Sequence, residues 1–208
     1  MLTLRVANVM RYAWPVIVSF HDAETRQLWE TARCRNLPNQ LHRQALKKLY
    51  ILNAALALDN LTVPPGNRLE KLKGNREGQH SIRINDKYRI CFIWRDGNAH
   101  QVEIVDYHGG GQFMRTPAAA IHPGEILLTE FMEPLGLTAY RLAKDLRVPQ
   151  PRIYSVLHGK RAISADTAVR LGIYFNLPAQ FWLNLQNQYD LRLAAANAQH
   201  RQIKPRAA

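Results

Sequence analysis

Cysteine is scarce in this sequence, which has only two, Cys34 and Cys91, among 208 residues. Neither belongs to a CxxC motif or to the paired cysteine and histidine spacing that binds zinc. Isolated cysteines of this kind are typical of reduced thiols in cytosolic proteins. The sequence therefore predicts a cytoplasmic protein that contains no metal site and requires no cofactor.

Long hydrophobic runs are also lacking. The longest, near residues 54–58, is far too short to cross a lipid bilayer. The apolar stretch within residues 1–16 is interrupted by Arg5 and Arg11 and has no small-residue cleavage site, so it is unlike a signal peptide. We therefore expect no membrane association.

Acidic residues are few. The chain has 28 Lys and Arg against 16 Asp and Glu, a formal net charge of +12. The excess is divided evenly, because residues 1–113 contain 16 basic and 10 acidic residues and residues 114–208 contain 12 and 6. Such an excess favours a polyanionic partner, and either half could bind nucleic acid separately. The length fits one large or two small domains.

The stretch 71–92 is dense in lysine and arginine. It begins in a glycine-punctuated loop and continues as two short segments in which apolar and polar residues alternate. Alternation of period two predicts half-buried strands, and the polar residues 85–87 between them predict a hairpin loop. A third strand, 101–107, follows the turn residues 96–98.

Both hairpin loops must contain an odd number of residues if the apolar residues of all three strands are to face one core. A three-residue loop at each hairpin, with residue 84 opposite 88 and Arg95 opposite Ala99, satisfies this condition. The core face then consists of Ile82, Ile84, Tyr88, Ile90, Phe92, Val102 and Ile104. The other face consists of Arg83, Arg89, Cys91, Arg95, Glu103 and Tyr107. Arginines directly opposite each other repel unless an anion lies between them, although a solvated basic face is the simpler interpretation.

The segments before this sheet predict a strand and two helices. Residues 16–20 form a short apolar strand, and Asp22 caps a helix that runs to about Arg35. A second helix begins at Pro38, with apolar residues three or four apart on one face. We therefore expect an α+β fold in which an antiparallel sheet has helices on one face and leaves the other free.

The rest of the chain predicts a separate helical unit. Helices are expected at 123–133, 138–146, 150–157, 164–176 and 178–189, after a glycine-rich linker. The predicted organisation is an extension (1–15), an α+β domain (16–108), a linker (109–113), a helical domain (114–193) and a basic tail (194–208).

The pattern from Leu137 to Gly159 is typical of a helix-turn-helix. Thr138 caps the first helix, and Ile153, Val156 and Leu157 face inward from the second. The residues left to contact DNA are Thr138, Gln150, Arg152, Tyr154, Ser155, Lys160 and Arg161. Glutamine can read adenine and arginine can read guanine in a major groove. A purely structural helical pair is the alternative, and the basic surroundings favour DNA binding.

At this point two resemblances can be stated. Residues 16–108 resemble HigB host-inhibition toxins, which are RelE-like, ribosome-dependent mRNA interferases. The matching motifs are Leu69-Glu70-Lys71-Leu72-Lys73-Gly74, Ser81-Ile82-Arg83-Ile84, Tyr88-Arg89-Ile90 and Asp106-Tyr107-His108. Residues 114 to about 193 resemble HigA antitoxins of the Xre-type helix-turn-helix class, including Ile121-His122-Pro123-Gly124-Glu125. The two proteins are normally separate, but here they form one chain in toxin-then-antitoxin order.

The first resemblance implies metal-independent cleavage of mRNA on the ribosome, in which a ribose 2′-OH attacks the adjacent phosphate. Such a site must accept the 2′ proton, stabilise the added charge on phosphorus and assist the leaving 5′-oxygen. Carried over by motif position, Lys73 and Arg89 stabilise the phosphate, and Tyr107, flanked by Asp106 and His108, orients groups or transfers a proton.

The identity of the general base stays open. Some relatives have a histidine where this chain has Glu70, which is either a base or a surface residue. Further candidate contacts to RNA phosphates are Arg83, Lys71, Arg68 and Arg76.

The second resemblance implies that the helical half restrains the toxin and represses its own operator as a homodimer. The expected partners are the ribosome, mRNA and operator DNA. A five-residue linker spans at most about 18 Å, so contact between the halves occurs within one chain or between the chains of a dimer. A transcription regulator with a catalytically inactive first domain is the competing hypothesis.

Overall fold

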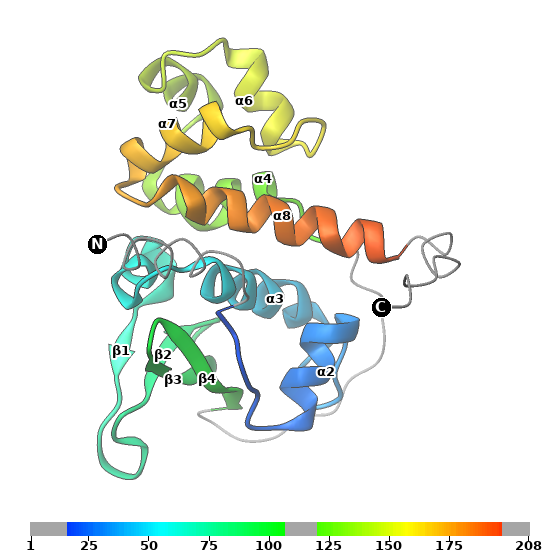
Figure 1. Cartoon of the computed structure of the whole chain (residues 1–208), viewed down its shortest axis with the longest axis vertical. Helices are drawn as coiled ribbons and strands as arrows, with labels where there is room; N and C mark the ends of the chain where they lie inside the picture. The colour runs from blue at the N-terminus through cyan, green and yellow to red at the C-terminus, as the bar shows by residue number, and fades with distance from the viewer. Residues whose placement is uncertain (1–15, 107–119, 197–208) are drawn as a thin grey trace, which may run out of the picture.

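The computed structural model describes residues 16–106 and 120–196, which form two packed units (Figure 1). The first unit is an α+β layer, and the second is entirely helical within the described residues. This confirms the predicted fold class. The predicted extension, the linker and most of the basic tail lie outside the described residues.

Two helices precede the sheet. α2 (Ala23–Thr31) begins where Asp22 accepts a hydrogen bond from the Thr25 amide at 2.7 Å. It ends four residues earlier than expected, because Ala32 adopts a left-handed conformation. α3 (Asn39–Ala54) begins after Pro38, as predicted, and its apolar residues Ala45, Leu49 and Leu52 are fully buried.

A four-stranded antiparallel sheet follows in the order β1-β2-β3-β4. The strands are β1 (Glu70–Lys71), β2 (His80–Arg83), β3 (Tyr88–Arg95) and β4 (Asn98–Asp106). β1 was not predicted. The apolar segment predicted as a strand at 16–20 makes only two isolated bridges, from Ile17 and Phe20 to β4. Two short 3-10 turns, η2 (Leu58–Thr62) and η3 (Pro65–Asn67), connect α3 to the sheet, and a third, η4 (Gly74–Arg76), lies between β1 and β2.

The first hairpin has the predicted register. Residue 84 lies opposite 88, and the Ile84 amide donates to the Tyr88 carbonyl at 2.9 Å. The second hairpin differs, because Arg95 pairs with Asn98 around a two-residue loop, Asp96-Gly97. Both loop residues have positive φ, 53° and 75°, the conformation that an Asp-Gly turn favours.

A β-bulge compensates for this shorter loop, which would otherwise turn the apolar side chains of β4 away from the core. The register shifts between Cys91 and Ile93, and Gln101, on the opposite strand, has a φ of 50°. One extra residue on β4 returns Val102 to the core face. Ile82, Ile90, Phe92 and Val102 are fully buried, and Ile104 packs against the core. The predicted core face is therefore confirmed, although the predicted loop length is wrong.

The helical unit contains the predicted helices with adjusted bounds. α4 (Pro123–Ile126) continues as a π-helical segment, η5 (Leu127–Met132), and a 3-10 turn, η6 (Glu133–Leu135). The remaining helices are α5 (Ala139–Asp145), α6 (Gln150–Leu157), α7 (Ala165–Phe175) and α8 (Ala179–Ala195). Gly124 allows α4 to approach α6 closely, since a Cβ there would lie 1.8 Å from the Val156 carbonyl oxygen.

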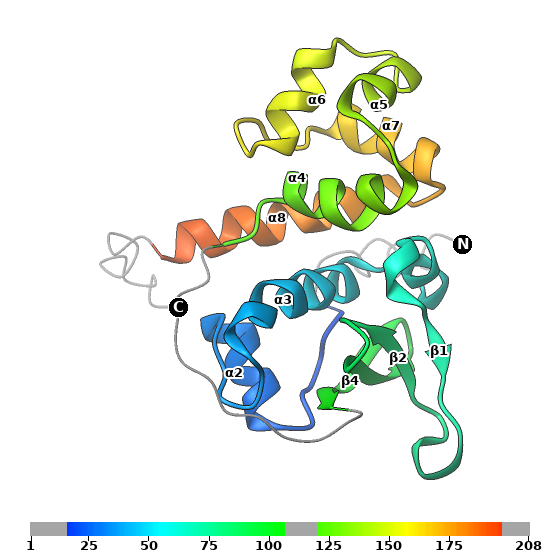
Figure 2. The ribbon, with the colours of Figure 1, turned by 180° about the vertical axis from the view of Figure 1, so that it is seen from behind.

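The two units pack through α3. Both views show α8 lying along α3, with α5 and α6 at the end of the molecule farthest from the sheet (Figures 1 and 2). The helical unit therefore covers the helical layer of the first unit and leaves the other face of the sheet uncovered. Within the described ranges, no helix has the length and apolar character needed to cross a membrane.

Candidate phosphate-binding and DNA-binding sites

The free face of the sheet brings two arginines together. Arg83 and Arg89 are directly paired across β2 and β3, as the register predicts. Each already has an internal anion: Arg83 forms an ion pair with Asp86, and Arg89 lies 3.2 Å from the Glu70 carboxylate. The repulsion between them is thus reduced by carboxylates of the same chain.

Arg89 also donates to neighbouring oxygens. Its Nε donates to the Ser81 hydroxyl at 2.8 Å, and one Nη donates to the Arg68 carbonyl at 2.7 Å. The guanidinium is therefore held in one orientation over β2. An arginine with a fixed planar fork is well suited to bind two oxygens of a phosphate.

A second charged pair lies in the adjacent row of this face. Arg76 reaches from the turn after β1 to Glu103 on β4, at 2.7 Å. The same row contains Ser81 and Cys91, which are fully buried. Burial raises the pKa of the Cys91 thiol, which disfavours its thiolate form.

The other predicted residues of this site are placed differently. Lys71, Lys73 and Arg68 have exposed side chains on β1 and its flanking turns. Asp106 pairs with Tyr88 at the end of the sheet and lies on the helical side, away from Arg89. Tyr107 and His108 lie outside the described residues.

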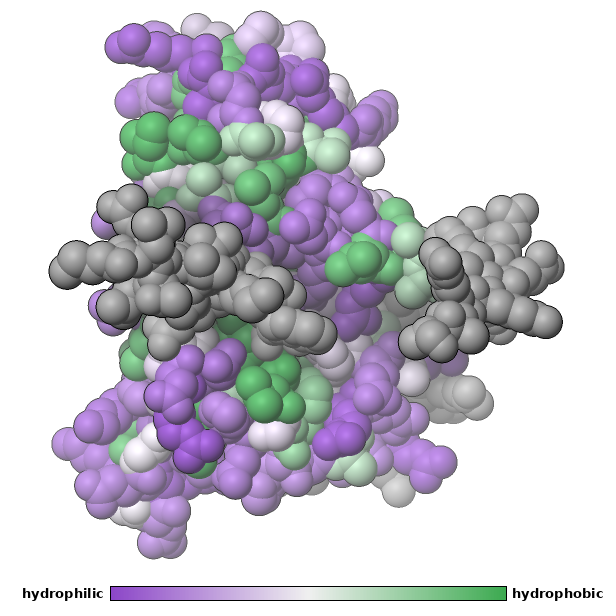
Figure 3. Space-filling model, viewed as in Figure 1, coloured by the Kyte–Doolittle hydropathy of each residue, from purple (hydrophilic) through white to green (hydrophobic). Residues whose placement is uncertain are grey.

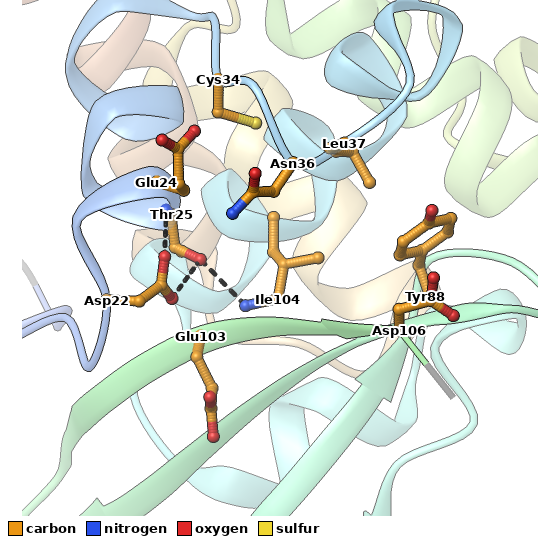
Figure 4. A pocket seen from close by; sticks show the side chains of 10 residues that line it. All are labelled: Asp22, Glu24, Thr25, Cys34, Asn36, Leu37, Tyr88, Glu103, Ile104 and Asp106. Atoms are coloured by element: carbon orange, nitrogen blue, oxygen red, sulfur yellow. Dashed lines mark hydrogen bonds between the residues drawn. The ribbon is translucent and has the colours of Figure 1, made fainter. Parts of the chain in front are cut away.

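Asp106 instead lines a cavity of about 300 Å³ between α2 and the sheet (Figure 4). Its walls include Asp22, Tyr88 and Cys34, and the Thr25 hydroxyl accepts a hydrogen bond from the Ile104 amide at 2.9 Å. Burial raises the pKa of the Cys34 thiol to about 11. No cluster of His, Cys, Asp and Glu that could bind a metal occurs among the residues described.

The helix-turn-helix has the predicted inward and outward faces. Thr138 accepts from the Arg141 amide at 3.1 Å and so caps α5. Ile153, Val156 and Leu157 of α6 are buried. Of the predicted DNA-binding residues, Gln150, Tyr154, Lys160, Arg161 and Thr138 are exposed, and Arg152 and Ser155 are half-buried.

Arg152 has a partner that the sequence did not indicate. Its Nη1 lies 2.5 Å from the Asp166 carboxylate at the start of α7, which also binds Arg170 at 3.0 Å. These hydrogen bonds lower the pKa of Asp166. Asp166 therefore fixes the direction of the Arg152 side chain on the outer surface of α6.

The contact between the two units is another feature that sequence reasoning missed. Glu125 of α4 forms ion pairs with Arg43 and Lys47 of α3, and Glu130 of η5 lies 2.6 Å from Lys48. The sequence does contain a signal for this contact. Residues 39–54 contain three basic and no acidic residues, whereas residues 121–137 contain three acidic and no basic residues.

A polar stripe on α8 completes the contact. Asn184 donates to the Ala54 carbonyl at 3.2 Å, and Gln188 accepts from Asn53 at 3.1 Å. One turn further, the Arg192 guanidinium lies 4.6 Å from the ring centre of Trp29 and 5.0 Å from that of Tyr50. In this single chain the two units therefore pack against each other through α3 and α8.

Fold and sites together define a class: an α+β toxin-like unit with a basic free face, joined to a helix-turn-helix unit. Residues 18–108 match the family model described as the RelE-like toxin of the type II toxin–antitoxin system HigB. Residues 128–182 match a helix-turn-helix family model.

Individual relatives agree with this class. Toxin HigB-1 of Vibrio cholerae is 43% identical over 83 residues, which are 39% of this chain and 87% of that protein. Virulence-associated protein I of Dichelobacter nodosus is 51% identical over 80 residues, 38% of this chain and 74% of that protein. Antitoxin HigA-1 of Vibrio cholerae is 31% identical over 77 residues, 37% of this chain and 72% of that protein. The chain therefore belongs to the HigB and HigA families of type II toxin–antitoxin proteins, with the toxin-like unit first.

Among solved structures, Pseudomonas aeruginosa antitoxin HigA with its promoter is 43% identical. The match covers 43% of this chain and 100% of that one, with a TM-score of 0.41.

Proposed function

We propose that residues 16–108 are a latent, ribosome-dependent mRNA endonuclease that needs no metal, and that residues 114–193 restrain it and repress their own operator. The observation that carries the first part is the free face of the sheet. Arg83 and Arg89 are paired there across two strands, and each is matched by an internal carboxylate. Such a site prefers an anion, and a phosphodiester is the anion that this family of toxins cleaves.

In this proposal Arg89 exchanges its internal acceptors for oxygens of the scissile phosphate. The guanidinium would then stabilise the charge that develops on phosphorus, with Lys73 arriving from the exposed turn after β1. Glu70, once released from Arg89, would lie beside the bound phosphate and accept the 2′ proton. Tyr107, with His108 beside it, is proposed to orient the substrate or transfer a proton.

Toxicity on expression tests this half of the proposal. We expect residues 16–108, expressed without the helical half, to stop growth and to cleave translated mRNA. Arg89→Ala should abolish cleavage, with a loss of about 2–4 kcal/mol of transition-state stabilisation, as for a deleted oxyanion donor.

A matched control is Arg95→Ala, because Arg95 lies at the exposed end of the same strand. It should leave cleavage unchanged. If the wild-type fragment folds, binds ribosomes and is harmless, the endonuclease proposal is wrong and the regulator hypothesis takes its place.

Operator binding is the second part of the proposal. It is supported by the exposed residues of α6 and by Arg152, whose side chain Asp166 fixes at the surface. Arg152→Ala should weaken binding to the operator by roughly 1–3 kcal/mol if the guanidinium reads a guanine. Titrations with the operator and with random-sequence DNA distinguish the roles, because an equal loss on both would mean that Arg152 contacts only phosphate.

The proposed homodimer has a candidate surface on α7. Val169 and Ile173, one turn apart, are 49% and 78% exposed beside an open cavity of about 410 Å³ at the α7–α8 turn. Figure 3 shows apolar surface in this region. Ile173→Glu should reduce the molar mass in light scattering from dimer to monomer. An unchanged mass would place the dimer contact elsewhere.

A further inference from the structure

Asn67 is a buried polar residue at the end of η3, and both polar atoms of its side chain form hydrogen bonds. Its Nδ2 donates to the Leu61 carbonyl at 2.9 Å, and its Oδ1 accepts from the Lys48 ammonium at 2.8 Å. The residue has no exposed surface. A buried amide of this kind fixes the backbone around it, because losing either partner leaves a polar atom unsatisfied.

Lys48 connects Asn67 to the helical half. Its side chain is only 2% exposed, and its ammonium contacts both Asn67 and the Glu130 carboxylate, at 2.8 and 2.6 Å. Burial lowers the pKa of Lys48, and the charge of Glu130 opposes this effect. Without Glu130 the ammonium would be a buried charge with no counter-ion, so the position of Lys48 depends on the helical half being docked.

Arg68 connects Asn67 to the phosphate site. It follows Asn67 directly and has a φ of 43°, a conformation that a residue other than glycine keeps only when its surroundings fix it. Its carbonyl then accepts from Arg89 Nη2 at 2.7 Å, and the Glu70 carboxylate contacts the same nitrogen at 3.2 Å. A continuous set of contacts therefore runs from Glu130 through Lys48, Asn67 and Arg68 to Arg89.

We propose that Asn67 is a positioning residue through which the docked helical half keeps Arg89 occupied by the Arg68 carbonyl and the Glu70 carboxylate. The inference rests on the proposed role of Arg89 and adds a mechanism for restraining it. Docking leaves the free face of the sheet uncovered. The effect reaches the site from the helical side of the sheet. Lys48 fixes η3, and η3 in turn fixes the Arg68 carbonyl, which competes with RNA phosphate for Arg89.

The test uses the full chain and a fluorescein-labelled single-stranded RNA whose riboses are 2′-O-methylated, so that binding is measured without cleavage. Glu130→Gln keeps the shape of the side chain but removes the counter-ion of Lys48. We expect it to tighten RNA binding by about tenfold, the effect of releasing one charge-assisted hydrogen bond. The Nε–H resonance of Arg89 should shift in the NMR spectrum of the same variant.

Two further variants decide the interpretation. Glu125→Gln is the matched control, since Glu125 belongs to the same docking contact but pairs with Arg43 and Lys47 and not with Lys48. It should change RNA binding little. Adding Arg89→Ala to Glu130→Gln should remove the gain completely.

An equal gain from Glu125→Gln, or a gain that persists without Arg89, would overturn the proposal, because docking alone would then explain the effect. If Glu130→Gln does not fold, Lys48→Met/Glu130→Gln replaces it. This double variant leaves no buried charge and still deprives Asn67 of its donor. The proposed function fails separately: if Arg89→Ala alone changes neither RNA binding nor cleavage, the phosphate site itself is wrongly assigned.

Discussion

At the residue scale, the important cations of this chain are already paired with carboxylates. Lys48 is matched by Glu130, Arg89 by Glu70 and Arg152 by Asp166. The sequence predicts the arginines well, because strand parity and helix periodicity place them. It does not predict their partners, which come from distant segments, as with Glu130, 82 positions beyond Lys48.

The thiol of Cys34 provides a prediction at the same scale. Burial is the main cause that raises its pKa to about 11, so the thiolate is rare at neutral pH. In a Cys91→Ser background, alkylation of Cys34 by iodoacetamide at pH 8 should be roughly tenfold slower than alkylation of a free cysteine peptide. The thiolate fraction of Cys34 is much lower, but a thiolate of higher pKa is intrinsically more nucleophilic, which offsets part of this difference. The rate, followed by mass spectrometry, should continue to rise beyond pH 9. A plateau near pH 9, as in the peptide, would contradict this expectation.

At the scale of elements, periodic patterns predict what an element is, but not always where it ends. α6 has the predicted bounds, and α7 is capped at Ser164 and Asn176, the two ends of the predicted range. α8 extends six residues beyond its prediction, because contacts with Trp29 of α2 and Tyr50 of α3 continue to Arg192. The two-residue turn and the bulge of β4 were missed, since parity alone cannot distinguish a three-residue loop from a two-residue loop with one compensating residue.

Gln101 tests this account of β4. Its side chain is exposed, and its φ of 50° disfavours any residue with a Cβ. Gln101→Gly should therefore leave the free energy of unfolding unchanged or raise it by up to about 1 kcal/mol, whereas Gln101→Val should lower it by about 1–2 kcal/mol. Urea unfolding of both variants gives the comparison. Equal losses would indicate that the side chain matters more than the bulge geometry.

At the scale of the whole molecule, the halves are held together by ion pairs and hydrogen bonds along α3. Sequence reasoning assigned two units in the right order, but it could not place one on the other. That placement depends on the facing charges of α3 and residues 121–137, which are visible in the sequence only once the two segments are known to meet.

Acidification should weaken this contact. Burial would raise the pKa of Glu125, but hydrogen bonds from Arg43 and Lys47 outweigh burial and hold it below its usual value of 4.5. A carboxyl whose pKa is depressed on folding contributes stability above its unfolded pKa and loses that contribution as the pH falls through the folded value.

We therefore expect the free energy of unfolding of the wild type at pH 7 to be about 1 kcal/mol higher than that of Glu125→Gln, after allowing for solvent screening. Well below pH 4.5 the two proteins should be equally stable. Urea unfolding at a series of pH values measures this. Glu133→Gln, which changes an exposed acid of η6, is the control. A difference that does not depend on pH would rule out the Glu125 ion pairs as its source.

Because α8 packs on α3 within one chain, the relative amounts of the two halves cannot vary. Two separate proteins associate according to their concentrations, so loss or dilution of one releases the other. In this chain the two halves are covalently connected, so the effective concentration of one half near the other does not change with expression level. The ratio of the halves is fixed at one to one when each molecule is synthesised. Under the proposed restraint, separating the halves would require breaking the chain or a competitor for α3, whereas a change in supply would have no effect.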